Sequence, residues 1–346
     1  MQEILSRYDL AAGEYTIEPF GTGLINATWK ISRTDGERSF ILQRINTAVF
    51  NNPGQIAENV RQLKNFFDQR FPHYLFVAPL ADVDNRLLVP DADGNVFRLI
   101  PFVDNSVTID VVMHSAHAYE AAAQFGKFTR LLREFNQDRL QYTLPDFHNL
   151  SLRITQFEEA VANAPAGRKA ETAETIDLAR RYRGIADRYD SIVAGGAIPR
   201  RVIHHDTKIS NVLFDRNGHG LCVIDLDTVM PGYFISDVGD MMRTYLSPAN
   251  EEEQDLDKIE VRTDFLRAIA DGYLSEMGGA LTEAEQKLFF YSGEFMIYMQ
   301  ALRFLTDHLN GDTYYGARYP GHNFMRAKNQ FVLLARYLEA AKSLAL

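Results

Sequence analysis

The sequence contains a single cysteine, Cys222, among its 346 residues. One thiol can form neither an internal disulfide nor a cysteine-rich metal site, which excludes disulfide scaffolds and zinc-finger-like domains. Long apolar runs are also missing, because Arg98 and Pro101 interrupt the stretch from 96 to 103 and nothing approaches the about 18 residues of a membrane span. The first 13 residues carry three charged side chains and no apolar core of the signal-peptide type. We therefore expect a cytoplasmic protein without a membrane partner.

An excess of positive charge is absent as well. The chain has 36 Lys and Arg residues against 46 Asp and Glu residues, which gives a formal net charge of -10. Proteins that bind nucleic acid need a surplus of Lys and Arg to neutralise phosphates, so we expect no nucleic-acid partner. The apolar fraction of 46% and the charged fraction of 24% are those of an ordinary globular protein. The length suggests roughly two domains of about 150 residues.

The first hundred residues have the pattern of an antiparallel sheet. Asp35-Gly36 and Asp93-Gly94 each separate two β-rich runs, and Asp-Gly between such runs is a hairpin signal because glycine adopts positive φ at little cost. The four runs are 28–33, 38–45, 87–89 and 96–100. Apolar residues at helical spacing predict one helix at about 55–68. Residues 15–103 are thus expected to form a sheet with one helix.

After residue 104 the pattern is mostly helical. Helices are expected over 117–135 and 282–309, and a capping-box match opens the second at Thr282. The polar, alanine-rich segment 162–174 indicates a surface connection or a frayed helix end. The acidic run 251–257 is interpreted as the solvated face of a helix.

One segment of this half departs from the helical pattern. Short apolar runs at 212–214 and 221–224 flank Asn217-Gly218 and predict a strand hairpin. Polar side chains stand where these strands begin and end: Asp206, Lys208 and Asn211 precede the hairpin, and Asp225 and Asp227 follow it. Such positions form the lip of a cleft, where polar groups reach a ligand.

These residue types match the needs of phosphoryl transfer. Mg²⁺ takes hard oxygen ligands from one or two carboxylates plus the phosphates, and Asp225 with Asn211 would supply such ligands. Asp206 is placed to act as the base for the acceptor hydroxyl, and Lys208 would neutralise charge on the transferred group. The order of these residues matches the catalytic loop and metal-binding Asp of protein kinases. The alternative is that Asp206 and Asn211 cap turns and that Asp225 and Asp227 end a strand.

The sequence resembles the aminoglycoside phosphotransferase and choline kinase superfamily, and the likeness spans nearly the whole chain. His204-His205-Asp206, Asn211 and the Ile224–Asp227 string carry the superfamily resemblance. Longer strings are similar to the bacterial N-acetylhexosamine 1-kinases; these are 19–26, 40–43, 225–232, 303–307 and 311–315. That subfamily phosphorylates the anomeric hydroxyl of N-acetylgalactosamine or N-acetylglucosamine with ATP and Mg²⁺.

The resemblance implies an α+β, protein-kinase-like fold with two lobes. Residues 1–103 would be the nucleotide-binding lobe, a small antiparallel sheet with one helix, and 104–346 the larger, mostly helical lobe for catalysis and acceptor binding. The degenerate glycine motif would cover the phosphates, since glycines let backbone N–H groups approach them. It consists of Gly21, Gly23 and Asn26. The stretch 100–103 would offer backbone groups to adenine; its site residues are Pro101, Phe102 and Val103.

Gln43 departs from the kinase pattern. Kinases place a Lys, and relatives an Arg, on this strand to hold the α- and β-phosphates, whereas Gln43 is neutral. We interpret it as a variant nucleotide clamp that still donates hydrogen bonds to a phosphate. Glu58 is the nearest candidate for the usual ion-pair partner, but it has no evident Lys to bind.

Acceptor recognition is expected from the second lobe. Arg303 borders the apolar stripe of the 282–309 helix, where a charged group needs a partner or a ligand. It either pairs with Asp307 four residues on or, with Tyr314, binds sugar hydroxyls or the acetamido group. Tyr314 alternatively packs in the core. Asp227 is a further candidate for binding metal, acceptor or backbone. His204 and His205 are expected to hold the loop by hydrogen bonds and not to bind metal.

Two other functions stay open at this point. One is the same chemistry on another hydroxyl acceptor, such as choline, an aminoglycoside or homoserine. The other is a non-catalytic nucleotide-binding protein, which Gln43 and the degenerate glycine motif suggest. Arg303, Arg318, Arg326 and Lys328 favour a neutral or anionic acceptor over a cationic one.

Overall fold

The computed structural model describes residues 1–10, 15–21, 25–36 and 38–343. Its contacts divide the chain into two units, each built from several stretches of sequence. The first unit contains residues 1–107, 134–145 and 213–231, and the second contains residues 108–133, 146–212 and 232–346. The predicted functional boundary after Val103 stays a prediction, because it concerns which part of the chain binds which substrate.

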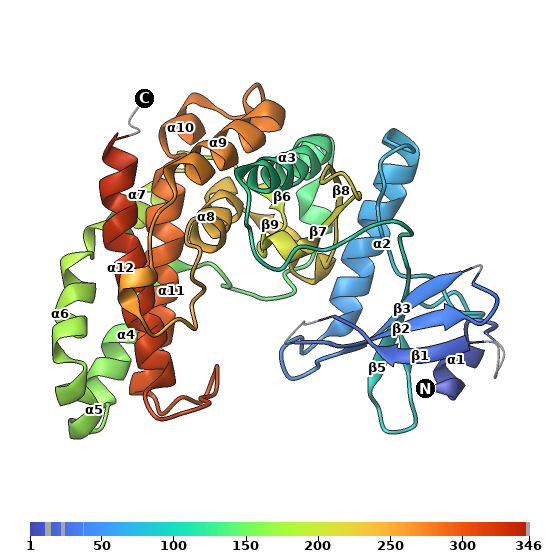
Figure 1. The fold of residues 1–346 in the computed structure, drawn as a ribbon, viewed down its shortest axis with the longest axis horizontal. Coiled ribbons are helices and arrows are strands. Elements are labelled where there is room, and N and C mark those ends of the chain that lie inside the picture. The colour runs from blue at the N-terminus through green and yellow to red at the C-terminus, as the bar shows by residue number, and fades with distance from the viewer. Residues whose placement is uncertain (11–14, 22–24, 37, 344–346) are drawn as a thin grey trace. The chain divides into compact units, whose positions relative to one another are not determined.

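A five-stranded sheet in the order β1-β2-β3-β5-β4 forms the centre of the first unit (Figure 1). Its strands pair antiparallel, as the Asp-Gly hairpin signals predict, and Gly36 and Gly94 have φ values of +79° and +82°. The strands are β1 (Tyr15–Pro19), β2 (Ala27–Arg33), β3 (Ser39–Ile45), β4 (Val89–Pro90) and β5 (Val96–Pro101).

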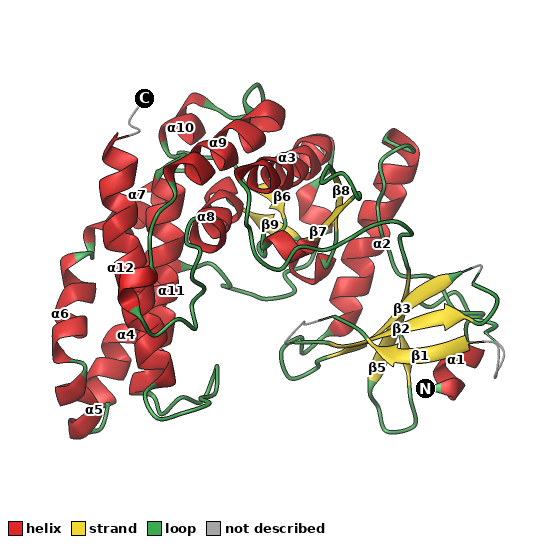
Figure 2. Cartoon of the chain, viewed as in Figure 1, coloured by secondary structure: helices red, strands yellow, loops and turns green. Residues whose placement is uncertain are grey.

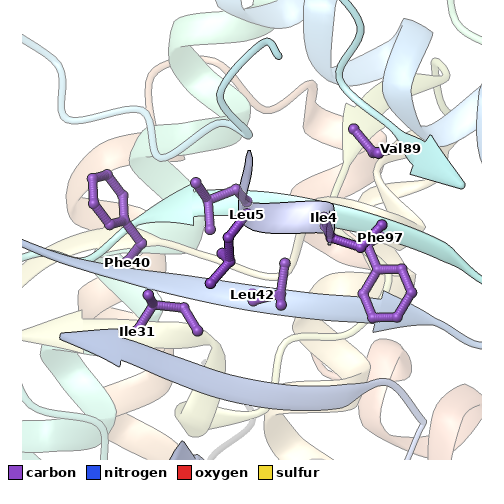
Figure 3. Close-up of a cluster of buried hydrophobic side chains, with 8 residues drawn as sticks. Ile4, Leu5, Ile31, Phe40, Leu42, Val89 and Phe97 are labelled. Atoms are coloured by element: carbon purple, nitrogen blue, oxygen red, sulfur yellow. The ribbon is translucent and has the colours of Figure 1, made fainter. Parts of the chain in front are cut away.

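One face of this sheet carries an apolar core. Alternate residues of the strands, among them Phe40, Leu42 and Phe97, pack against Ile4 and Leu5 of α1 (Gln2–Ser6) (Figure 3). Side chains that alternate with these point to the other face, which is therefore where Gln43 of β3 and Arg98 of β5 lie. The sequence analysis predicted one helix in this part of the chain and missed the five-residue α1.

The first unit also contains α2 (Pro53–Arg70) and most of the hairpin formed by β7 (Val212–Phe214) and β8 (Gly220–Val223). The buried stripe of α2 is the predicted one and consists of Ile56, Val60, Leu63 and Phe67, joined by Asn59. Asn59 binds the backbone of Gln141 and the carbonyl of Val229, which ties the helix to the segment after β8.

Helices make up most of the second unit (Figure 2). They are α3 (Ser115–Leu131), α4 (Leu150–Asn163), α5 (Ala166–Glu171), α6 (Ala173–Arg181), α7 (Gly184–Ala194), α8 (Phe234–Tyr245), α9 (Thr263–Met277), α10 (Glu283–Lys287), α11 (Tyr291–Leu309) and α12 (His322–Ser343). The short strand β6 (Arg201–Ile203) precedes the loop of Asp206, and the residues of β9 (Met230–Gly232) are divided between the two units. The predicted α+β fold is confirmed.

Two expectations about local structure are wrong. The helix predicted over 282–309 is divided into α10 and α11, although the capping box of Thr282 and Glu285 is present. The acidic run 251–257 is not a solvated helix face. Glu251 binds Arg243 and Arg326, and the run consists of turn, irregular backbone and the start of a short 3-10 helix.

Segment 162–174 includes the short helix α5 between α4 and α6. Within the described ranges, no helix is both long and apolar enough to cross a bilayer.

Candidate active site

Two buried carboxylates of α8 hold the loop that carries Asp206. The Asp237 carboxylate accepts the backbone N–H groups of His204 and His205 at 2.9 and 2.7 Å, and Asp240 accepts the N–H of Thr207 at 2.9 Å. Burial raises the pKa of Asp237 to about 7, against the opposite effect of its two backbone hydrogen bonds. The backbone on both sides of Asp206 is therefore fixed from within the second unit.

The Asp206 carboxylate has two polar neighbours from its own loop. Lys208 Nζ lies 3.0 Å from Asp206 Oδ1, and Asn211 Nδ2 donates to Asp206 Oδ2 at 3.1 Å and to its carbonyl at 2.9 Å. Burial raises the pKa of Asp206, but the charge and hydrogen bond of Lys208 outweigh burial and hold the pKa below its usual value. Asp206 is thus ionised at neutral pH and accepts hydrogen bonds. The structure places Asp206, Lys208 and Asn211 together.

The residue before Asp206 is conformationally strained. His205 is buried and has a φ of +67°, a region that side chains other than glycine seldom occupy. Gly232 makes room for it, because a Cβ added at position 232 would lie 2.5 Å from His205 Nε2.

The described residues contain no group of three or more His, Cys, Asp or Glu side chains that could hold a metal.

An arginine and three aromatic rings form a patch in the second unit, which we call the Arg303 patch. The Arg303 guanidinium lies 5.4 Å from the ring centre of Phe147, 5.8 Å from that of Tyr314 and 5.5 Å from that of Tyr315. The Phe147 ring lies 6.5 Å from the His205 ring. Phe147 therefore joins the Arg303 patch to the loop of Asp206.

The predicted alternative pairing of Arg303 with Asp307 is wrong. Asp307 instead accepts the backbone N–H groups of Tyr314 and Tyr315 at 2.7 and 2.9 Å, which shapes the loop after α11. Arg303 contacts Gln300 and the Tyr314 hydroxyl, and no carboxylate among the described residues forms an ion pair with it. Tyr314 is 71% exposed, so it does not pack in the core.

In the first unit, Asp225 and Asp227 have opposite environments. Asp225 is exposed and takes a left-handed conformation with φ of +60°, whereas Asp227 is buried and forms an ion pair with Arg98. Asn26 Nδ2 donates to the other carboxylate oxygen of Asp227 at 2.9 Å. Burial alone lowers the pKa of Arg98, but the charge of Asp227 outweighs it and raises the pKa.

The predicted nucleotide-binding residues have the following places. Gly21 has a φ of +79°, and Gly23 lies outside the described residues. Asn26 binds Asp227 and the backbone N–H of Asn46, and the Gln43 amide binds Thr28 and Arg98. Pro101 ends β5, and Phe102 N–H donates to Ser39 at 3.1 Å. The Val103 carbonyl accepts the Ser106 hydroxyl at 2.6 Å.

Residues 16–274 match the sequence profile of the phosphotransferase enzyme family, about three quarters of the chain. The chain belongs to this family. The prediction that the protein is a phosphotransferase acting on a hydroxyl acceptor is confirmed.

Solved structures share the fold of this phosphotransferase. An aminoglycoside phosphotransferase from Alicyclobacillus acidocaldarius aligns with a TM-score of 0.67 at 14% identity, covering 99% of this chain and 96% of that one. A microcompartment-associated aminopropanol kinase aligns at 0.63 and 17%, covering 99% and 97%. A spectinomycin phosphotransferase in complex with ADP and spectinomycin aligns at 0.61 and 10%, covering 99% and 97%. These neighbours confirm the two-lobe kinase-like architecture.

The sequence did not predict the contacts that four residues of the phosphotransferase make in and around the site. Asp237 and Asp240 are carboxylates three residues apart on a helix whose other residues are mostly apolar, and that pattern was the available signal. Arg98 interrupts an apolar strand, which is the same kind of signal. Phe147 offers no signal, because an aromatic residue in a loop is not distinctive.

Proposed function

We propose that this phosphotransferase transfers the γ-phosphoryl group of ATP, in the presence of Mg²⁺, to the C1 hydroxyl of an N-acetylhexosamine. The observation that carries the proposal is the connection, through Phe147, of the Asp206 loop to the Arg303 patch. A loop with a base that Phe147 joins to an arginine and to the exposed ring of Tyr314 suits a neutral sugar, because aromatic faces pack on sugar rings and a guanidinium donates to an acetamido oxygen.

The proposed chemistry uses the second unit's loop directly. Asp206 accepts a hydrogen bond from the C1 hydroxyl and takes its proton as the bond from C1 oxygen to phosphorus forms and the bond from ATP's bridging oxygen to the γ-phosphorus breaks. A lowered pKa is compatible with this role, because the loose transition state demands little basicity from the base. Lys208 supplies positive charge beside the transferring group.

Asn211 and Asp225 are the residues that we propose for Mg²⁺. Their carboxamide and carboxylate oxygens are the hard donors that Mg²⁺ prefers, and both hydrogen bonds of Asn211 to Asp206 use its nitrogen, which leaves Oδ1 for a metal. Asn211 directly precedes β7, and Asp225 follows β8 by two residues, so both adjoin the same hairpin. When bound, Mg²⁺ would neutralise the phosphates.

The residues that we propose for nucleotide binding belong to the first unit. Gly21, Gly23, Asn26 and Gln43 are proposed near the phosphates, and Pro101, Phe102 and Val103 near adenine. The spectinomycin phosphotransferase that shares this fold holds ADP, which supports ATP as the donor.

The strings similar to N-acetylhexosamine 1-kinases, such as 303–307 and 311–315, support the choice of sugar.

Choline and other cationic acceptors are less suitable, because Arg303 lies near the guanidinium of Arg153. Burial lowers the pKa of Arg153, and the positive charge of Arg303 lowers it further.

A transfer assay against free hexosamines tests the proposal. ATP consumption is measured with N-acetylgalactosamine, N-acetylglucosamine, choline, homoserine and an aminoglycoside, and the product is mapped by NMR. We expect turnover with an N-acetylhexosamine and phosphate on C1. Transfer to C6, turnover with choline alone, or MgATP binding without any transfer would refute the proposal, and Asp206→Asn serves as the inactive control.

A further inference from the structure

A row of polar side chains crosses the sheet on the face opposite α1. The strand register pairs Thr28 with Gln43 and Gln43 with Arg98, so the three side chains lie side by side. Gln43 Nε2 donates to Thr28 Oγ1 at 3.3 Å, and Arg98 Nε donates to Gln43 Oε1 at 2.9 Å. Gln43 thus uses both ends of its amide within the sheet.

The row ends on the segment that follows β8. Arg98 Nη1 binds Asp227 Oδ1, and the side chains of Arg98 and Asp227 are only 4% and 2% exposed. Asn26 Nδ2 holds Asp227 Oδ2 at 2.9 Å, and the Thr143 hydroxyl holds the Asp227 carbonyl at 2.7 Å. Asp227 is therefore fixed at three atoms by side chains from three separate parts of the first unit.

This arrangement explains the neutral residue at position 43. A Lys there would stand directly opposite the buried Arg98 guanidinium, and like charges in facing positions of a sheet destabilise it. The positive charge expected on β3 is instead on β5, one strand further along. The carboxylate that pairs with Arg98 is Asp227. Glu58 of α2, the candidate for the usual partner, binds Arg61 and Gln62 of its own helix.

Asp227 lies two residues after Asp225 in a single 3-10 turn, η4 (Leu226–Thr228), for which Asp225 is the N-terminal flanking residue. Asp225 has a φ of +60° there, a conformation that requires support from its surroundings. Asp227 is the middle residue of η4, so the contacts that fix Asp227 hold this turn and supply that support.

We propose that Arg98 is a positioning residue for the metal: through Asp227 it holds the turn in which Asp225 presents its carboxylate. The inference rests on the proposed function, since it assigns Asp225 to Mg²⁺. Arg98 does not itself bind phosphate, because its Nε and Nη1 are already engaged and its side chain is buried.

The test measures Mg²⁺-dependent ADP binding by calorimetry in three variants of the full chain. In Arg98→Met we expect the Mg²⁺ concentration for half-maximal ADP binding to rise by roughly 10- to 100-fold, as is typical when a residue behind a metal ligand is lost. Asp227→Asn should act in the same direction. The KM for the acceptor should remain unchanged, because the hydrogen bonds of Arg98 and Asp227 involve no residue of the Arg303 patch.

The double variant Arg98→Met/Asp227→Asn separates positioning from simple stability. Removing one partner leaves a buried unpaired charge, whereas removing both leaves none, so the double variant should unfold nearer to the wild-type temperature than either single variant. We expect its Mg²⁺ dependence to stay shifted. A double variant or a folded single variant with wild-type Mg²⁺ dependence would overturn the proposal.

Arg86→Met is the matched control. Arg86 also binds a buried carboxylate of the first unit, that of Asp82, at 2.7 Å, and no part of the proposed site involves it. It should lower the melting temperature and leave the Mg²⁺ dependence unchanged; an equal shift in this control would assign the Arg98 effect to lost stability. If the wild type itself binds no MgADP, the proposed function fails and not the positioning role alone.

Discussion

The support of the Asp206 loop by Asp237 predicts a specific dependence of stability on pH. Asp237 is fully buried, and its carboxylate accepts the N–H groups of His204 and His205. Burial raises its pKa from 3.8 to about 7 in the folded protein. The perturbation that we choose is Asp237→Asn, which keeps the shape of the side chain and removes its titration.

The size and sign follow from proton linkage. Between pH 3.8 and about 7, folded Asp237 holds a proton that the unfolded chain has released. Folding therefore takes up a proton in this interval, and raising the pH destabilises the folded protein. Each pH unit contributes up to about 1.4 kcal/mol, so the free energy of unfolding should fall by about 2–3 kcal/mol between pH 5 and pH 8 from this group.

Urea unfolding of the wild type and of Asp237→Asn at pH 5 and pH 8 measures the effect. All other titrating groups are common to the two proteins, so the difference between their unfolding free energies reports Asp237. We expect the wild type to lose stability relative to Asp237→Asn as the pH rises. A difference that is constant with pH, or that changes in favour of the wild type, would show that the two backbone donors outweigh burial.

Three further substitutions probe the site. Asp206→Asn should lower kcat by roughly 10²-fold or more while MgATP binding survives, and unchanged turnover would refute its role as the base. Arg303→Met should raise the KM of the sugar roughly 10-fold or more without affecting the Kd of MgATP, whereas Arg318→Met, an exposed arginine of the same region, should leave both unchanged; equal effects would contradict the assignment. Gly232→Ala should destabilise the protein by about 1–3 kcal/mol, measured by urea unfolding, because the new Cβ meets His205; wild-type stability would show that the loop yields easily.

Turn residues and helical spacing in the sequence predicted most of the five-stranded sheet and helix α2 of the first unit. The Asp-Gly pairs determine strand pairing over a few residues, and β2, β3, β4 and β5 lie within two residues of the four predicted runs, whereas β1 was not predicted as a separate strand. The stripe of α2 was likewise legible, because helical spacing is a local property. The loop with Asp206, Lys208 and Asn211 was predictable because these residues are close in sequence.

Interactions between distant residues were not predictable in the same way. The acidic run was assigned to solvent, whereas Glu251 binds Arg243, eight residues before it, and Arg326, which lies 75 residues away. Arg98 was read as an interruption of an apolar strand, since its partner Asp227 lies 129 residues away. Buried charges signal that a partner exists, but only the fold identifies it.

The central proposal is that Asn211 and Asp225, which precede and follow one strand hairpin in the sequence, bind the Mg²⁺ of the nucleotide complex. A calorimetric double-mutant cycle on MgADP binding with Asn211→Ala and Asp225→Ala tests it most directly. The account predicts that each variant loses most of the Mg²⁺-dependent affinity and that the double variant loses little more. Losses that simply add, or an Asp225→Ala variant with intact affinity, would contradict it.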